Sequence, residues 1–229
     1  MKKLTKIFAM IAAVSLLMLM LSGCSGEQDK TKPAEPITPD VTEIPAIPAG
    51  TKAQPEAENA TGRQVGERFE GVIMMEGMEE TVRYEHIRSD AVGFEMDYDY
   101  ESFTRQSESG RERFVSIYDN PAAPMNYLEV IYLDQSPDAV SASIGDELSK
   151  NYDIIREPFV LDRAGVCERI DASATKDNRT PDMMEAVYII PAGDGCLVAA
   201  AHYSFESAEG YGRRIAEMLH TLTVISQAE

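Results

Sequence analysis

The amino-terminal segment constrains the fold most, because it is typical of a segment that is removed before the mature chain folds. The chain begins with a short cationic stretch that holds Lys2, Lys3 and Lys6, and residues 7–21 then form an almost unbroken apolar run. This run is too short for a comfortable transmembrane helix, which needs about 20 apolar residues. It fits the apolar middle of a secretory signal peptide. We therefore expect the folded part of the protein to begin further along the chain.

The end of the apolar run carries a more specific signal. It reads Leu21-Ser22-Gly23-Cys24, which resembles the bacterial lipobox, where small residues precede an obligatory cysteine. The resemblance implies cleavage after Gly23, a diacylglyceryl thioether on Cys24, and usually acylation of the new amino terminus with a fatty acid such as palmitate. Two or three acyl chains anchor a protein stably where one does not.

We therefore predict that residues 1–23 are a lipoprotein signal peptide and that Cys24 is the lipidation site. The mature protein is then expected on the extracytoplasmic face of the cell membrane, held by its lipid anchor. The alternatives are an ordinary signal peptide followed by a chance cysteine, or a signal anchor that is not cleaved.

Residues 24–62 predict a disordered, lipid-anchored tether. Residues 25–62 hold six of the twelve prolines of the chain and no aromatic residue. Such a segment cannot bury enough apolar surface to order itself, and its prolines favour an extended chain. A tether of this kind would hold a folded domain away from the membrane.

The charge of the chain excludes some classes of partner. The formal net charge is −18, and residues 63–229 alone carry −17. A nucleic-acid binder needs a basic surface that neutralises phosphates, so no nucleic-acid partner is expected. An acidic domain is also repelled by anionic lipid headgroups, and it can attract cations or a basic envelope protein.

Short alternating segments predict that residues 63–229 form a single domain rich in strands. Residues 67–75 and 78–87 flank Glu76-Gly77 and predict an amino-terminal hairpin over about 67–87. Ser136 and Pro137 predict the start of a helix whose apolar face holds residues four apart. A final helix is expected after Ser207. Further strands are expected over residues 94–98, 114–118, 127–133, 159–161, 166–175, 184–190 and 196–205.

This order of elements favours an α+β fold, an antiparallel sheet with few helices packed on it. The segment Gly93-Phe94-Glu95-Met96-Asp97-Tyr98, the Ser-Pro helix start and the ending Met218 to Val224 resemble the PsbP/Mog1-like fold. The resemblance covers residues 84–226, and its motifs are structural. It implies a sheet between helices and a binding or assembly role, and it supplies no catalytic residue. The hairpin at 67–87 either extends this sheet or forms a separate ribbon.

The cysteines and histidines give no catalytic or metal motif. Strand register places Cys167 and Cys196 on either side of one strand, about 9.5 Å apart, which is too far for a disulfide. Both are therefore expected to be buried, free thiols. His86, His202 and His220 are scattered and lack the spacing of zinc ligands. We expect no metal and no cofactor.

The acidic and methionine-rich segments each allow two interpretations. Residues 97–101 hold three carboxylates but lack the spacing of an EF-hand loop, so they are expected to form the solvated face of a strand that binds cations weakly at most. The methionines near the hairpin and near residue 183 are expected to fill the core, or else to form an adaptable contact surface. They are Met74, Met75, Met78, Met183 and Met184.

The sequence therefore predicts a non-catalytic binding or scaffolding module, because no nucleophile or phosphate-binding motif is present. The alternative is a cell-envelope enzyme, or enzyme accessory, that uses scattered carboxylates. A deep cleft holding two carboxyls with raised pKa would favour the enzyme. An exposed apolar patch near Met74–Met78 or along a sheet edge would favour the binding module.

Overall fold

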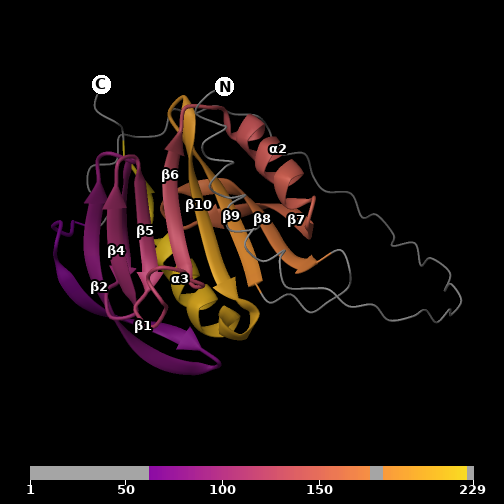
Figure 1. The fold of residues 1–229 in the computed structure, drawn as a ribbon. Coiled ribbons are helices and arrows are strands. Elements are labelled where there is room, and N and C mark those ends of the chain that lie inside the picture. The colour runs from indigo at the N-terminus through magenta and orange to yellow at the C-terminus, as the bar shows by residue number, and fades with distance from the viewer. Residues whose placement is uncertain (1–61, 176–182, 226–229) are drawn as a thin grey trace, which may run out of the picture. The chain divides into compact units, whose positions relative to one another are not determined.

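The computed structural model describes residues 62–175 and 183–225, all within one unit of the chain. This part contains a four-stranded sheet of order β1-β2-β3-β11 and a seven-stranded sheet of order β4-β5-β6-β10-β9-β8-β7 (Figure 1). Every strand pair is antiparallel, which confirms the predicted α+β class with few helices. Within the described residues, no helix is long and apolar enough to span a bilayer.

The first three strands belong to the four-stranded sheet, the next seven to the seven-stranded sheet, and the last to the four-stranded sheet again. The bounds of the elements are β1 Arg68–Met75, β2 Met78–Ser89, β3 Phe94–Asp99, β4 Phe103–Glu108, β5 Arg111–Ser116, β6 Tyr127–Leu133, α2 Pro137–Leu148, β7 Tyr152–Leu161, β8 Gly165–Thr175, β9 Met183–Ala192, β10 Gly195–Ser204, the short helices η1 Phe205–Ser207 and η2 Ala208–Gly212, α3 Arg213–His220 and β11 Thr223–Val224.

The predicted amino-terminal hairpin is confirmed. Met75 lies opposite Met78 across a two-residue turn. Both turn residues have positive φ, 50° at Glu76 and 80° at Gly77, which is the geometry of the type I′ turn that hairpins prefer. The hairpin does not extend the large sheet; it pairs with β3 to form a separate sheet.

Helix α2 begins where the sequence predicts. The Ser136 hydroxyl accepts a hydrogen bond from the Ala139 amide at 3.4 Å, and Pro137 occupies the first turn. The final helix differs in its start. Ser204, not Ser207, caps the short helix η1 that precedes it, because the Ser204 hydroxyl accepts from the Ser207 amide.

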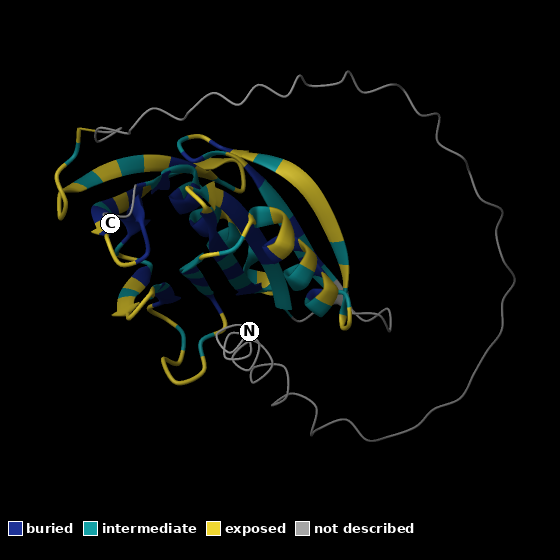
Figure 2. Cartoon of the chain, turned by 90° about the horizontal axis from the view of Figure 1, so that it is seen from above, coloured by how far each residue is buried: buried dark blue, intermediate teal, exposed yellow. Residues whose placement is uncertain are grey.

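Two apolar cores hold the layers together (Figure 2). The larger core lies between the two sheets and includes Phe94, Phe114, Leu197 and Met218 of α3. The smaller core lies between α2 and the other face of the large sheet. It contains Val140, Leu148, Ile170, Ala172, Val187, Ile189, Cys196 and Val198.

Several strands differ from the prediction, among them β5, which begins at Arg111 and not at 114, and β7, which begins at Tyr152 and not at 159. Strand β4 was not predicted, because only Phe103 among its residues is a buried apolar side chain. Strand β9 continues through Pro191, where a turn was expected, and the turn follows at Gly193 with φ of 60°.

Candidate functional site

Cys24, the one site residue that the sequence predicts, lies outside the described residues, as do the predicted signal peptide and almost all of the predicted tether. The lipidation of Cys24 therefore stays a prediction. The remaining residues that the sequence singled out fall into separate places in the domain.

The prediction of a solvated carboxylate face on β3 is wrong. All six residues of β3 are buried, and Asp97 and Asp99 are each 1% exposed. The Asp97 carboxylate is held by His86, whose Nδ1 lies 2.6 Å from Oδ1, and by Arg63, whose Nη1 lies 3.1 Å from Oδ2. Asp97 is therefore a structural group, because burying a carboxylate requires partners of this kind.

Asp99 and Glu95 are paired in the same way. Arg214 of α3 donates to Asp99 Oδ2 at 2.7 Å and also pairs with Glu80 of β2. The Arg88 guanidinium lies 2.8 Å from Glu95 Oε1. Because these carboxylates are already paired, none of them is free to bind a cation.

The two described cysteines are buried and free, as predicted. Their relative position differs by one residue from the expectation, since Leu197 lies opposite Ile190 and Cys196 lies opposite Pro191. Cys167 therefore packs between the sheets, whereas Cys196 packs under α2. Burial raises the pKa of each thiol to about 11, so both are unreactive at neutral pH.

The histidines lie apart, and the described residues contain no group of three or more possible metal ligands. His202 stacks on Tyr127 with ring centroids 4.9 Å apart, and its Nδ1 lies 3.0 Å from the Met125 carbonyl oxygen. Burial lowers the pKa of His202, which favours the neutral ring. His220 Nδ1 lies 3.2 Å from an oxygen of Asp162.

The methionines divide between the two interpretations. Met75 and Met184 pack against the large core, as the core-filling interpretation predicts. Met74 and Met78 are 49% and 68% exposed, and Val72 on the same hairpin is 63% exposed. Val72 and Met74 form an exposed apolar patch on one face of the hairpin, whereas Met78 lies directly opposite Met75 and therefore on the other face.

The patch lies along an open edge of the sheet. Within the described residues, β1 pairs with β2 on one side and with no strand on the other. The His86 amide donates to the Glu67 carbonyl at 2.9 Å, so Glu67 and every second residue after it direct their backbone groups toward β2. The backbone N–H and C=O groups of the alternate residues Arg68, Glu70, Val72 and Met74 therefore face outward.

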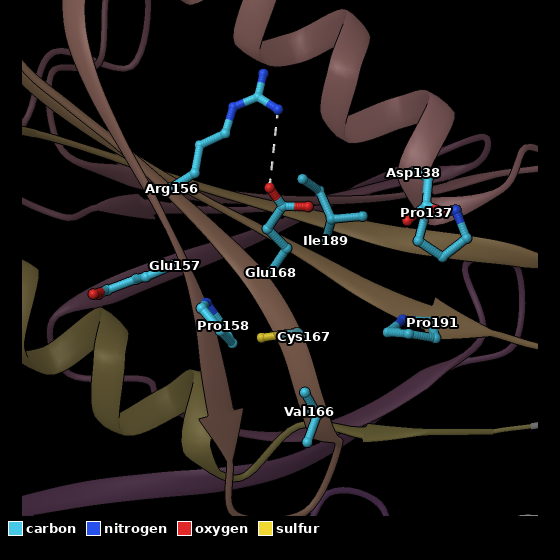
Figure 3. Close-up of a pocket in the computed structure, with 10 residues that line it drawn as sticks. All are labelled: Pro137, Asp138, Arg156, Glu157, Pro158, Val166, Cys167, Glu168, Ile189 and Pro191. Carbon is cyan, nitrogen blue, oxygen red and sulfur yellow. Dashed lines mark ion pairs between the residues drawn. The ribbon is translucent and has the colours of Figure 1, made fainter. Parts of the chain in front are cut away.

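A second candidate site is a hollow of about 390 Å³ beside the start of α2 (Figure 3). Apolar groups of β7, β8 and β9 line it, and the charged side chains Arg156 and Glu168 stand beside them. The Cys167 sulfur points away from Ile189, toward the large core. The lining residues are Pro137, Asp138, Arg156, Glu157, Pro158, Val166, Cys167, Glu168, Ile189 and Pro191.

Sequence reasoning did not find this hollow. Its lining comes from four elements that only the tertiary fold brings together. One local signal was present, because Gly145 stands inside a predicted helix, where glycine costs about 1 kcal/mol relative to alanine.

No family model and no curated protein sequence matches the chain. Its structure is similar to that of the Ran-binding protein Mog1p of Saccharomyces cerevisiae, with a TM-score of 0.42 and 13% identity over 63% of this chain and 97% of that chain. It is also similar to PsbP (CyanoP) of the cyanobacterium Synechocystis, with a TM-score of 0.44 and 9% identity over 62% of this chain and 92% of that chain. These similarities concern the fold alone and do not indicate a function.

Proposed function

We propose that this protein is a membrane-anchored, extracytoplasmic lipoprotein whose folded domain is a non-catalytic binding module. The anchor rests on the signal-peptide pattern and on the sequence Leu21-Ser22-Gly23-Cys24. The binding role rests on one observation: the apolar side chains Val72 and Met74 lie exposed on a sheet edge whose backbone groups are unpaired within the described residues. Such an edge accepts an added strand.

The partner that fits this edge is an extended, basic segment of an envelope protein. Residues 67–87 hold six acids and two arginines. Glu79 lies opposite Met74 on the neighbouring strand, and neither Glu79 nor Glu76 at the turn forms an ion pair with a described residue. A strand that alternates apolar and cationic residues would cover Val72 and Met74 with its apolar face, and its cations would lie within a Debye length of the excess carboxylates of the hairpin.

Mass spectrometry of the protein extracted from its own membrane tests the anchor. We expect the mature chain to begin at Cys24 and to carry the mass of a diacylglyceryl group, usually with a further acyl chain. Cys24→Ala is the matched control and should leave the chain uncleaved and without lipid. An unmodified Cys24 in the native protein would refute the anchor and leave the binding role to be tested separately.

A peptide-binding measurement tests the edge. The probe is a labelled peptide of about eight residues, the length of β1, that alternates valine and lysine. We expect saturable binding, strong weakening by salt, and no binding of the same peptide with glutamate in place of lysine.

Two variants of one residue serve as controls for this measurement. Val72→Pro removes an outward-facing amide without removing a bond between β1 and β2, so the variant should fold and lose the peptide. Val72→Thr keeps the amide and should retain most of the binding. Equal binding by wild type and Val72→Pro would contradict the proposed edge.

Glu185 supports a second candidate function, an envelope enzyme that uses carboxylates. Burial, together with the nearby charge of Glu129, raises the pKa of Glu185 to about 7, which is suitable for a general acid or base. Glu185 lies opposite His202 on the adjacent strand. Release of soluble fragments from purified cell wall by the wild type, lost in Glu185→Gln, would establish this function, and no release by the wild type would reject it.

A further inference from the structure

Among the residues that the structure describes, the Arg156 guanidinium beside α2 has only distant partners. Its Nη1 lies 3.4 Å from the Ser141 hydroxyl oxygen and 4.0 Å from Glu168 Oε1 (Figure 3). A guanidinium presents five N–H donors, and a well-formed pair with a carboxylate has N–O distances of about 2.8 Å. Arg156 therefore keeps donors that a carboxylate ligand can use, in contrast to the short ion pairs on β3.

Gly145 creates the space in which this guanidinium lies. A Cβ at position 145 would stand 1.4 Å from Nη2 and 2.3 Å from Cζ of Arg156. Glycine in a helix interior lowers stability by about 1 kcal/mol relative to alanine. The helix accepts this cost at the one place where a side chain would displace the guanidinium from the edge of the hollow.

The rest of the hollow supplies two further kinds of contact. The Glu168 carboxylate stands beside Arg156 and has no closer ion-pair partner among the described residues. Pro158, Val166 and Pro191 are exposed and give an apolar surface, and Val166 is 67% exposed although it is apolar. A cation-binding group, an anion-binding group and an apolar surface thus lie in one hollow.

We infer that this hollow binds a small zwitterion, an α-amino acid with an apolar side chain. Its carboxylate would bind Arg156, its ammonium group would bind Glu168, and its side chain would cover Pro158 and Val166. A zwitterion carries no net charge, so the strongly acidic domain does not repel it as it would a simple anion. The volume of about 390 Å³ lies within the usual range for small-ligand sites.

This site is separate from the hairpin edge. Its lining comes from β7, β8, β9 and the start of α2, whereas the edge belongs to β1. The two proposals can therefore fail independently.

Calorimetric titration of the full-length lipoprotein in mild detergent tests the inference, with L-leucine as the probe. We expect saturable binding with a Kd below about 10 mM. Leucinamide lacks the carboxylate and N-acetyl-leucine lacks the ammonium group, so each should bind at least about tenfold more weakly. If N-acetyl-leucine bound as tightly as leucine, the hollow would be an anion site and the inference would be wrong.

Two variants connect the binding to the hollow. Gly145→Ala should weaken leucine binding at least about tenfold while raising the unfolding temperature, because it displaces the guanidinium and improves the helix. Arg156→Gln should weaken binding to the same degree, and Ser149→Ala at the helix end, outside the hollow, is the matched control. No saturable binding by the wild type, or wild-type affinity in Gly145→Ala and Arg156→Gln, would overturn the inference.

Discussion

Two strands of the four-stranded sheet differ in which kind of side chain they bury: β3 buries charged side chains, whereas β1 exposes apolar ones. On β3, Glu95, Asp97 and Asp99 are buried, whereas on β1 the apolar Val72 and Met74 are exposed. The difference shows that partners, not polarity alone, decide which side chains are buried. The charges on β3 are paired by arginines and a histidine, whereas no strand among the described residues covers the edge that carries the apolar side chains on β1, which is the basis of the proposed binding role.

The largest effect is expected from breaking the buried charge network. Asp97→Asn would remove the buried carboxylate that pairs with His86, Arg63 and Arg163, and we expect a loss of about 3–5 kcal/mol in the free energy of unfolding. Glu70→Gln, which breaks an exposed pair with Arg83 in the same sheet, should cost less than about 1 kcal/mol. Urea unfolding of both variants measures the difference. Similar losses in the two would contradict a structural role for Asp97.

Glu185 is a half-buried carboxyl with no ion-pair partner among the described residues, so it tests the effect of an unpaired charge. Its folded-state pKa of about 7 lies above its ordinary value of 4.5, so the folded state binds this proton more tightly than the unfolded chain does. The contribution to stability is therefore complete below about pH 4.5, declines as the pH rises to about 7, and is lost above it.

Glu185→Gln removes this pH dependence. The variant should match the wild type near about pH 4 and exceed it by about 1–3 kcal/mol near about pH 8. Thermal unfolding at both pH values measures the effect, and Glu206→Gln on the surface is the control. Equal stability of variant and wild type near pH 8 would exclude a carboxyl with a raised pKa at position 185.

Replacing Gly145 by alanine should raise the free energy of unfolding by about 1 kcal/mol. The three atoms nearest to the added Cβ all belong to the end of the flexible Arg156 side chain, which can move away. Chemical unfolding measures this gain apart from any ligand. A loss of stability would show that the Arg156 position serves the fold and not binding.

The smallest effect is expected on the exposed side of β1. Val72→Thr should change the free energy of unfolding by less than about 0.5 kcal/mol. Ile73 is the next residue and is 4% exposed, so Ile73→Ala should cost about 2–5 kcal/mol. Urea unfolding of the two variants compares the faces of one strand, and a large loss in Val72→Thr would mean that this face supports the fold.

The sequence predicts best those elements whose signals are local. The hairpin follows from Glu76-Gly77 between alternating residues, β6 from an apolar run, and α2 from Ser136 and Pro137. These features depend on turn chemistry, caps and periodicity, which neighbouring residues determine. These local features were sufficient to predict the α+β fold class.

The prediction for β3 failed because its partners are remote in sequence. Asp97 pairs with Arg63, 34 residues earlier, and Asp99 pairs with Arg214, 115 residues later. An alternating acidic strand indicates a solvated face unless such partners are known. The hollow beside α2 was missed for the same reason, since Arg156 and Gly145 meet only after the helix packs on the sheet.

The central claim is that the β1 edge binds a partner strand. Hydrogen exchange at the backbone amides of β1 tests this claim most directly. In the free protein we predict slow exchange at Gly71 and Ile73 and fast exchange at Glu70, Val72 and Met74. The alternating valine–lysine peptide should slow exchange at the second group by more than about tenfold. Fast exchange at these three amides that the peptide leaves unchanged, or slow exchange before it is added, would contradict the account.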